Sequence, residues 1–188
     1  MKLLEQGGTG VALVTPFRND KVDFTALERI IHFVIEGGAD FVVSLGTTGE
    51  AITLTADEVS ETLQFTIKCT AGRVPVVAGF FGDNYTERLA QKLRSYNLEG
   101  VAAIMSSNPS YNKPTQEGIF RHYMAVAEAS PLPLVMYNVP GRTASNVQAE
   151  TTLRLANATD KFLAVKEASG DLTQAMKILK EKPERFQL

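Results

Sequence analysis

The stretch "FVVSLGTTGEAITLTADEVSETLQ", residues 41–64, joins three kinds of sequence signal. Phe41–Val43 is a short apolar run, and Gly46–Gly49 then places two threonines between two glycines. Thr55 and Glu58 follow at the spacing of a helix capping box. A simple turn needs only one glycine, so the paired hydroxyls either bind a ligand or serve only as loop residues. The stretch predicts one strand–loop–helix unit.

The same kind of apolar run occurs six times along the chain. The starts of the runs lie roughly 25 to 35 residues apart, which is the size of one strand-plus-helix unit. The runs are continuous rather than alternating, as expected of parallel strands that are covered on both faces. They are Val11–Val14, Phe41–Val43, Val76–Ala78, Val101–Met105, Leu134–Tyr137 and Leu163–Lys166.

Amphipathic stretches separate these runs and predict helices. The first is expected to begin at Thr25, with Glu28 in capping-box spacing, and to end at Gly37-Gly38. The others are "TADEVSETLQFTIK", "NYTERLAQKLRSYN", "TQEGIFRHYMAVAEA", "QAETTLRLA" and "DLTQAMKILKEK". Alternating strands and helices predict a parallel α/β sheet, either closed as a barrel or doubly wound. The first strand leads into "TPFRND" without a G-x-G-x-x-G fingerprint, which favours the TIM (β/α)8 barrel.

The length predicts an incomplete barrel. Eight units need about 250 residues, whereas the chain has 188, and Phe186–Leu188 could begin a seventh strand. Six units alone would leave open sheet edges. We therefore expect residues 1–188 to be a single (β/α)8-barrel domain that is C-terminally incomplete, without strands 7 and 8 and the C-terminal helical region.

Composition excludes several classes of function. The chain is 44% hydrophobic and 21% charged, with a net charge of −2, which gives no reason to expect nucleic acid or a membrane as partner. No apolar run approaches a transmembrane length and no signal peptide is evident, so we expect a cytoplasmic protein. The single cysteine, Cys69, excludes an internal disulfide. Neither His32 nor His122 lies in a metal-ligand pattern, so no metal site is expected.

Lys166 is the foremost candidate for chemistry. In parallel α/β folds, the loops at the carboxyl ends of the strands build the site. Lys166 follows the apolar residues Leu163–Val165, so we expect it to be buried. Burial disfavours a charged amine, and a neutral amine can attack a carbonyl to form a Schiff base. The alternative is a structural ion pair with Glu167 or another acid, which the pattern alone slightly favours.

Three further features have both a functional and a structural interpretation. Tyr137 ends an apolar strand and could relay protons near the amine, or be a core tyrosine. Arg142, after Pro140-Gly141, could bind a carboxylate through two hydrogen bonds, or be a solvated loop residue. Residues 46–49 could bind a small carboxylate or form a tight turn. Phosphate is disfavoured there because the chain has no G-x-x-x-x-G-K-[ST] motif.

Four motifs together resemble one enzyme family. "GTTGE", "NPSYNKPTQEG", "YNVPGRT" and "VKEASGD" are similar, in order and spacing, to the dihydrodipicolinate synthase family of lysine biosynthesis, which belongs with N-acetylneuraminate lyase among the pyruvate-dependent class I aldolases. The resemblance runs from Val11 to the C-terminus. It implies a (β/α)8 barrel followed by a small C-terminal helical region, a homotetramer, and condensation of pyruvate with L-aspartate-4-semialdehyde without a metal or organic cofactor.

The resemblance also implies roles for individual residues. Lys166 matches the Schiff-base lysine, and Tyr137 matches the tyrosine that relays protons during imine formation. Thr47 matches the relay threonine. Tyr111 matches the tyrosine that reaches into the neighbouring subunit's site and completes the relay.

The remaining matched positions bind substrate. Thr48 matches the position that binds the pyruvate carboxylate, next to Gly46 in a loop whose glycines let the backbone approach it. Arg142 matches the arginine that holds the semialdehyde carboxylate and favours the synthase over N-acetylneuraminate lyase. Other 2-keto-acid aldolases and a non-catalytic homologue or inactive fragment are the alternatives. Lysine-inhibited members have histidines in the helix after the glycine–threonine loop and a tyrosine at the position of Ser110, so we expect weak feedback inhibition by lysine.

Overall fold

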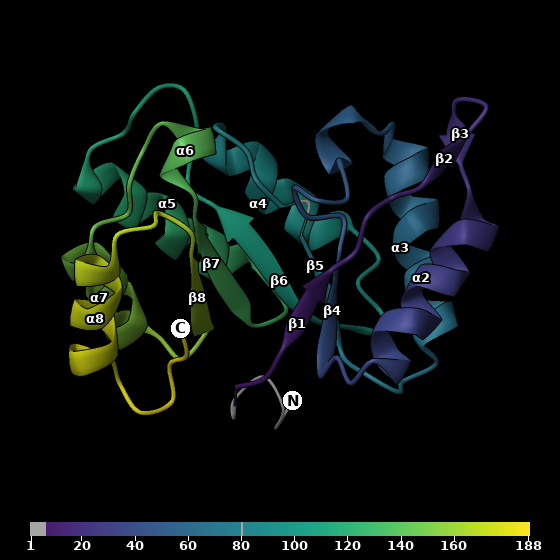
Figure 1. Ribbon diagram of the computed structural model, residues 1–188. Helices are drawn as coiled ribbons and strands as arrows, with labels where there is room; N and C mark the ends of the chain where they lie inside the picture. The colour runs from purple at the N-terminus through teal and green to yellow at the C-terminus, as the bar shows by residue number, and fades with distance from the viewer. Residues whose placement is uncertain (1–6, 80) are drawn as a thin grey trace. The chain divides into compact units, whose positions relative to one another are not determined.

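The computed structural model describes residues 7–79 and 81–188 (Figure 1). The chain divides into two compact units. The first comprises residues 1–80 and Leu98–Ile104, and the second comprises Phe81–Asn97 and Met105–Leu188. That residues 1–188 belong to a single domain, as expected from the sequence, stays a prediction.

Six strands form the main sheet, hydrogen-bonded in the order β1-β4-β5-β6-β7-β8. The registers described for β1–β4, β4–β5, β5–β6 and β7–β8 are all parallel. This spatial order is also the sequence order, whereas a doubly wound sheet reverses direction at a switch point. The architecture is therefore that of the first six βα units of a (β/α)8 barrel, and all six predicted strands are confirmed. Their bounds are Gly10–Ala12, Phe41–Ser44, Val76–Ala78, Val101–Ser107, Leu134–Asn138 and Phe162–Glu167.

In the first unit, the helices α2 (Phe24–Glu36) and α3 (Ala56–Thr70) pack against each other. The capping box predicted at Thr55 and Glu58 is present at the start of α3. The expected start of α2 at Thr25 is wrong. Asp23 caps this helix instead, because its carboxylate accepts a hydrogen bond from the Ala26 amide at 3.0 Å.

Two short elements of the first unit were not predicted. The strands β2 (Phe17–Arg18) and β3 (Lys21–Val22) form a two-stranded antiparallel hairpin. Both residues of its turn, Asn19 and Asp20, have positive φ, as a tight two-residue hairpin turn requires. A single turn of 3-10 helix, η1 (Ala51–Thr53), lies between the glycine–threonine loop and α3.

The second unit is built around β7, β8 and the helices that cover them. Tyr123 is buried at its centre, where its ring packs edge-on against Phe162 and its hydroxyl donates a hydrogen bond to the Ser106 carbonyl at 3.0 Å. The four longer helices lie in the predicted stretches, and only the four-residue α6 was not expected. The helices are α4 (Thr86–Ser95), α5 (Gln116–Ala129), α6 (Pro140–Thr143), α7 (Ala149–Ala158) and α8 (Leu172–Glu181).

The last residues of the chain pair with β8. Gln187 forms a parallel bridge with Ala164, and its backbone exchanges hydrogen bonds with Leu163 and Val165. One isolated bridge is not a strand, so the beginning of a further strand at Phe186–Leu188 stays a prediction, with which this parallel pairing agrees.

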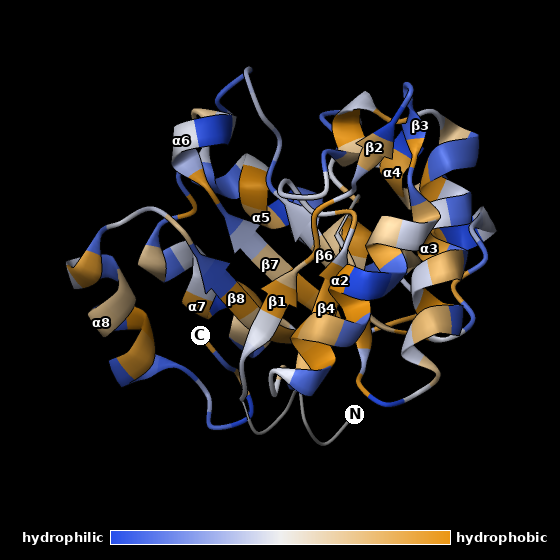
Figure 2. Cartoon of the chain, turned by 45° about the vertical axis from the view of Figure 1, so that its right-hand side comes forward, coloured by the Kyte–Doolittle hydropathy of each residue, from blue (hydrophilic) through white to orange (hydrophobic). Residues whose placement is uncertain are grey.

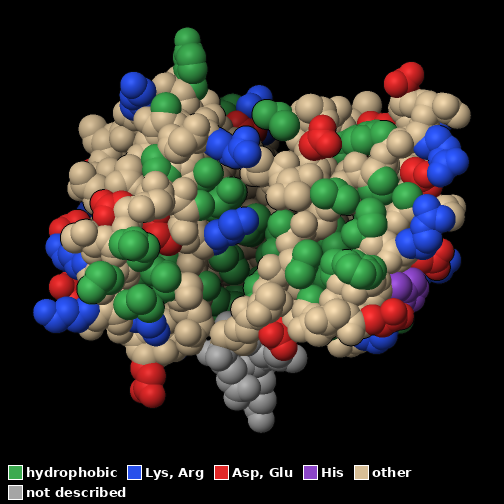
Figure 3. All heavy atoms as spheres, viewed as in Figure 1, with side chains coloured by type: hydrophobic (Ala, Val, Ile, Leu, Met, Phe, Trp, Pro, Cys, Tyr) green, Lys and Arg blue, Asp and Glu red, His purple; other side chains and the backbone are tan. Residues whose placement is uncertain are grey.

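One face of α8 is apolar and exposed. Leu172, Met176 and Leu179 are 77%, 69% and 51% exposed, at the spacing of one helix stripe. The hydrophobic bands of α8 are visible in Figure 2, and Figure 3 shows hydrophobic side chains gathered over this helix. In the part of the chain that the structure describes, no helix combines the length and apolar character needed to cross a membrane.

Candidate active site

Lys166 and Tyr137 lie side by side at the carboxyl ends of β8 and β7. The two residues are partners in the parallel register of these strands. Lys166 Nζ lies 4.6 Å from the centroid of the Tyr137 ring. Tyr137 is buried and Lys166 is exposed. The structure therefore places an accessible amine next to a buried phenol.

The expectation that Lys166 is buried is wrong. Among the described residues, the edge of β8 away from β7 is paired only through the bridge between Ala164 and Gln187. Lys166, near the end of β8, is therefore exposed to solvent. The structural alternative, an ion pair with Glu167, is also absent from the described residues. Successive strand side chains point to opposite faces, and the Glu167 carboxylate is bonded elsewhere.

A buried amide network holds Glu167 behind the Lys166–Tyr137 pair. Asn138 Nδ2 donates to Glu167 Oε2 at 2.9 Å and to Asn146 Oδ1 at 2.8 Å. Gln174 Nε2, from α8, also donates to Glu167 Oε2 at 2.8 Å. Asn138 and Glu167 are themselves register partners on β7 and β8. The network therefore joins the two strand ends one residue beyond Tyr137 and Lys166, and sequence reasoning did not identify it.

Tyr111 lies on a loop that meets α6, the helix that carries Arg142, in the second unit. The Tyr111 amide donates a hydrogen bond to the Thr143 carbonyl at the end of α6, at 3.0 Å. Tyr111 has a φ of 68°, which is rare for a tyrosine, and 86% of the residue is exposed. Arg142 is exposed on α6. Both side chains are thus presented to solvent and can contact a bound molecule.

The glycine–threonine loop lies in the first unit, at the carboxyl end of β4. Gly46 and Gly49 are buried, whereas Thr47 and Thr48 are exposed. The Gly49 amide donates to the Gly46 carbonyl at 3.0 Å, and a Cβ at Gly49 would lie 3.1 Å from the Leu13 carbonyl oxygen. Gly49 is therefore required for packing, while Thr47 and Thr48 are accessible to a ligand.

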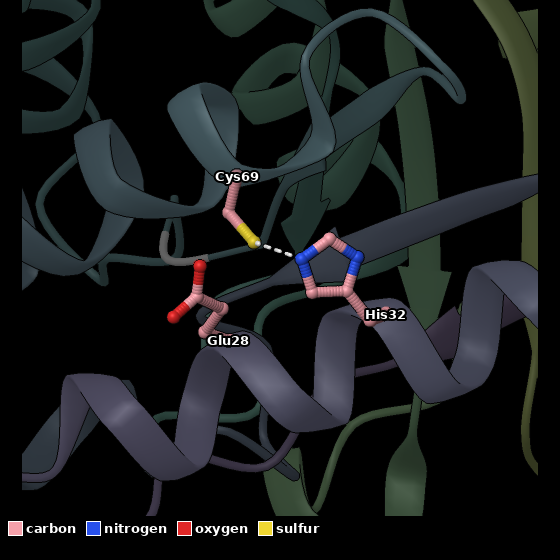
Figure 4. Close-up of side chains that lie close together, drawn as sticks. All are labelled: Glu28, His32 and Cys69. Carbon is pink, nitrogen blue, oxygen red and sulfur yellow. Dashed lines mark hydrogen bonds between the residues drawn. The ribbon is translucent and has the colours of Figure 1, made fainter.

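A second cluster, which sequence reasoning missed, lies between α2 and α3. Figure 4 shows Glu28 and His32 on one helix pointing toward Cys69 on the other. One ligand atom of each residue lies within 4.8 Å of the others, and Cys69 Sγ is 3.9 Å from His32 Nε2. Burial and the nearby Glu28 carboxylate raise the pKa of the Cys69 thiol, which keeps it protonated at neutral pH. The only signal in the sequence is the four-residue spacing of Glu28 and His32.

The sequence model of the dihydrodipicolinate synthetase family matches residues 5–188. The chain belongs to this family.

Relatives of the dihydrodipicolinate synthetase family match over nearly the whole chain. The 4-hydroxy-tetrahydrodipicolinate synthases of Flavobacterium psychrophilum and Parabacteroides distasonis are each 49% identical over 180 residues, which is 95% of this chain and 61% and 60% of those proteins. The crystal structure of dihydrodipicolinate synthase from Thermotoga maritima is similar with a TM-score of 0.90 at 36% identity, covering 95% of this chain and 60% of that one. The chain thus spans about three fifths of the length of these relatives.

Proposed function

We propose that this chain carries the Schiff-base half of a 4-hydroxy-tetrahydrodipicolinate synthase. The activity is condensation of pyruvate with L-aspartate-4-semialdehyde in lysine biosynthesis. The observation that carries the proposal is the pairing of Lys166 with Tyr137, whose ring centroid is 4.6 Å from Nζ. Family membership supports it, because the named relatives are synthases of this kind.

The proposed reaction begins on Lys166. Its neutral amine attacks the ketone carbon of pyruvate, and the resulting carbinolamine loses water to give an imine. Both steps need a group that donates and accepts protons, and we assign this role to Tyr137, whose ring centroid lies 4.6 Å from Lys166 Nζ. Loss of a methyl proton then gives an enamine, with the protonated imine as the electron sink. Because the imine serves as the sink, the chemistry requires neither a metal nor an organic cofactor.

The second half of the reaction forms the carbon–carbon bond. The enamine carbon attacks the aldehyde carbon of the semialdehyde. The substrate amine then displaces Lys166 as the ring closes, which regenerates the free amine. Arg142, exposed on α6, is proposed to bind the semialdehyde carboxylate through a two-pronged pair.

The remaining roles follow the family resemblance. Thr47 is proposed to be the threonine of the proton relay, and Thr48 to bind the pyruvate carboxylate beside Gly46. The exposure of both hydroxyls agrees with these roles. Tyr111 is proposed to complete the relay in a neighbouring subunit of a homotetramer. Its 86% exposure on a loop is what a residue that serves another subunit requires. Cytoplasmic localisation stays a prediction.

Reductive trapping tests the Schiff base directly. The protein is incubated with pyruvate and sodium borohydride, digested, and analysed by mass spectrometry. We expect a mass gain on the peptide that contains Lys166, and none in the Lys166→Arg variant. Lys180→Arg is the matched control, since it makes the same change at an exposed lysine on α8. Trapping on several lysines alike, or unchanged trapping in Lys166→Arg, would refute the assignment.

The second substrate separates the synthase from its alternatives. Added before any borohydride, aspartate semialdehyde should react with the pyruvate enamine of the whole protein and so reduce the later trapping of pyruvate on Lys166, whereas N-acetylmannosamine should not. Consumption of the unreduced enamine by N-acetylmannosamine would instead indicate N-acetylneuraminate lyase. No trapping at all would favour a non-catalytic homologue or an inactive fragment.

A further inference from the structure

We propose that Glu28, His32 and Cys69 form a binding site for one zinc ion between α2 and α3. The site lies wholly within the first unit, and the proposed aldol chemistry does not use any of its residues. It combines a carboxylate oxygen, an imidazole nitrogen and a sulfur, which is a donor set that zinc accepts.

The helices place the three side chains at distances close to those of a tetrahedral site. Residues four apart lie on the same face of a helix, so Glu28 and His32 face α3 together. Zinc–nitrogen and zinc–sulfur bonds of about 2.0 and 2.3 Å separate tetrahedral ligand atoms by roughly 3.5 Å. Cys69 Sγ and His32 Nε2 are 3.9 Å apart, and all three ligand atoms lie within 4.8 Å of one another. Small rotations of the flexible ends would close the site, leaving a fourth position for water.

Arg73 controls this site. Its Nη2 lies 3.0 Å from His32 Nδ1 and donates to the Cys69 carbonyl at 2.9 Å. Because a guanidinium can only donate, His32 Nδ1 accepts, and the proton of the neutral ring is on Nε2, directed at Cys69 Sγ. Arg73 therefore stabilises the tautomer that cannot bind a metal through Nε2.

Zinc binding reverses this arrangement. The Cys69 thiol loses its proton to solvent, and the ring proton of His32 moves from Nε2 to Nδ1, so that Nε2 can bind the ion. Nδ1 then repels the Arg73 donor, which is exposed and free to turn into water. The thiolate and the Glu28 carboxylate together balance the two charges of the ion. The net change is one zinc ion bound and one proton released, without any redox step.

Cobalt substitution tests the site with a spectroscopic signal that is independent of enzyme activity. Titration of the reduced protein with Co²⁺ should give a near-ultraviolet thiolate-to-cobalt band that saturates at one equivalent, and Zn²⁺ should displace it. Cys69→Ser should remove the band. His32→Gln and Glu28→Gln should each weaken cobalt binding by at least ~10-fold. Removing a group that merely hydrogen-bonds to a metal ligand already weakens metal binding by about 10-fold or more, and these two residues are proposed as ligands themselves.

Two further variants make the test specific. Glu36→Gln removes the same charge from an exposed position on α2 and should leave binding unchanged. Arg73→Gln should tighten binding about fivefold, the factor expected from removing one nearby positive charge in a water-exposed site. A misfolded variant would not bind more tightly, so this gain cannot come from disruption. Absence of the thiolate band, saturation other than at one equivalent, or unchanged or weaker binding by Arg73→Gln would overturn the proposal.

Discussion

Removing the buried Asn138 side chain should strongly destabilise the second unit. Asn138 is fully buried. Its Nδ2 donates to Glu167 Oε2 at 2.9 Å, and its Oδ1 accepts from the Val147 amide at 2.9 Å. Asn138→Ala leaves Glu167 with its bonds from Gln174 Nε2 and the Ser169 amide, but leaves the Val147 amide without an acceptor.

The magnitude follows from these two losses. A hydrogen bond to a charged group contributes about 1.5–3 kcal/mol, and a buried donor without an acceptor costs about 1–3 kcal/mol. Allowing for overlap between the two, the expected loss in the free energy of unfolding is about 3–4 kcal/mol. Since domains are stable by only about 5–15 kcal/mol, this is a large fraction of the total.

Urea denaturation followed by circular dichroism measures the change. The matched control is Asn157→Ala, which makes the same substitution at an exposed position, where Asn157 Nδ2 donates to the Leu153 carbonyl at 2.8 Å. We expect the control to lose less than about 1 kcal/mol. Equal losses in the two variants would show that the buried network contributes no more than a surface bond, and the argument from burial would be wrong.

Three other predictions concern regulation, pH and association. Lysine should inhibit the whole enzyme only weakly, and an activity titration with half-inhibition at submillimolar lysine would contradict this. Burial lowers the pKa of His122 to about 4 from an ordinary 6.5, so the unfolded chain binds more protons between these values. Stability should therefore fall as pH falls from 6.5 to 4, by at most ~3 kcal/mol, and the slope should flatten in His122→Gln during urea titrations at each pH. Met176→Lys, in the exposed apolar stripe of α8, should reduce concentration-dependent association in sedimentation velocity. An unchanged distribution of sedimentation coefficients would mean that this stripe does not contribute to association.

Much of the fold could be predicted because local and global signals agree. Each apolar run is short and continuous, and the strands are confirmed at all six. The Thr55–Glu58 capping box was correct because both partners lie within one turn. Thr25 and Glu28 have the same three-residue spacing, but both lie inside α2, where this spacing is not a capping box. The sequence does not show that Asp23, and not Thr25, caps α2 by accepting a hydrogen bond from the Ala26 amide.

The candidate site was less predictable because exposure depends on neighbours in space. Lys166 follows an apolar run, which suggested burial, but its exposure depends on what lies beyond β8. The convergence of His32 and Cys69, 37 residues apart, depends on the rotation of two packed helices about their axes. Such a rotation is fixed by the whole interface between the helices, and no local pattern encodes it.

The agreement between spatial and sequence order of the strands has a consequence for how the chain folds. Each described parallel pairing joins strands separated by one crossover, so no contact in the sheet has to wait for a distant part of the chain. Formation can start at any neighbouring pair and extend in either direction. Amide exchange should therefore reveal groups of amides that open together, each group being one strand–helix–strand segment, instead of one event for the entire sheet.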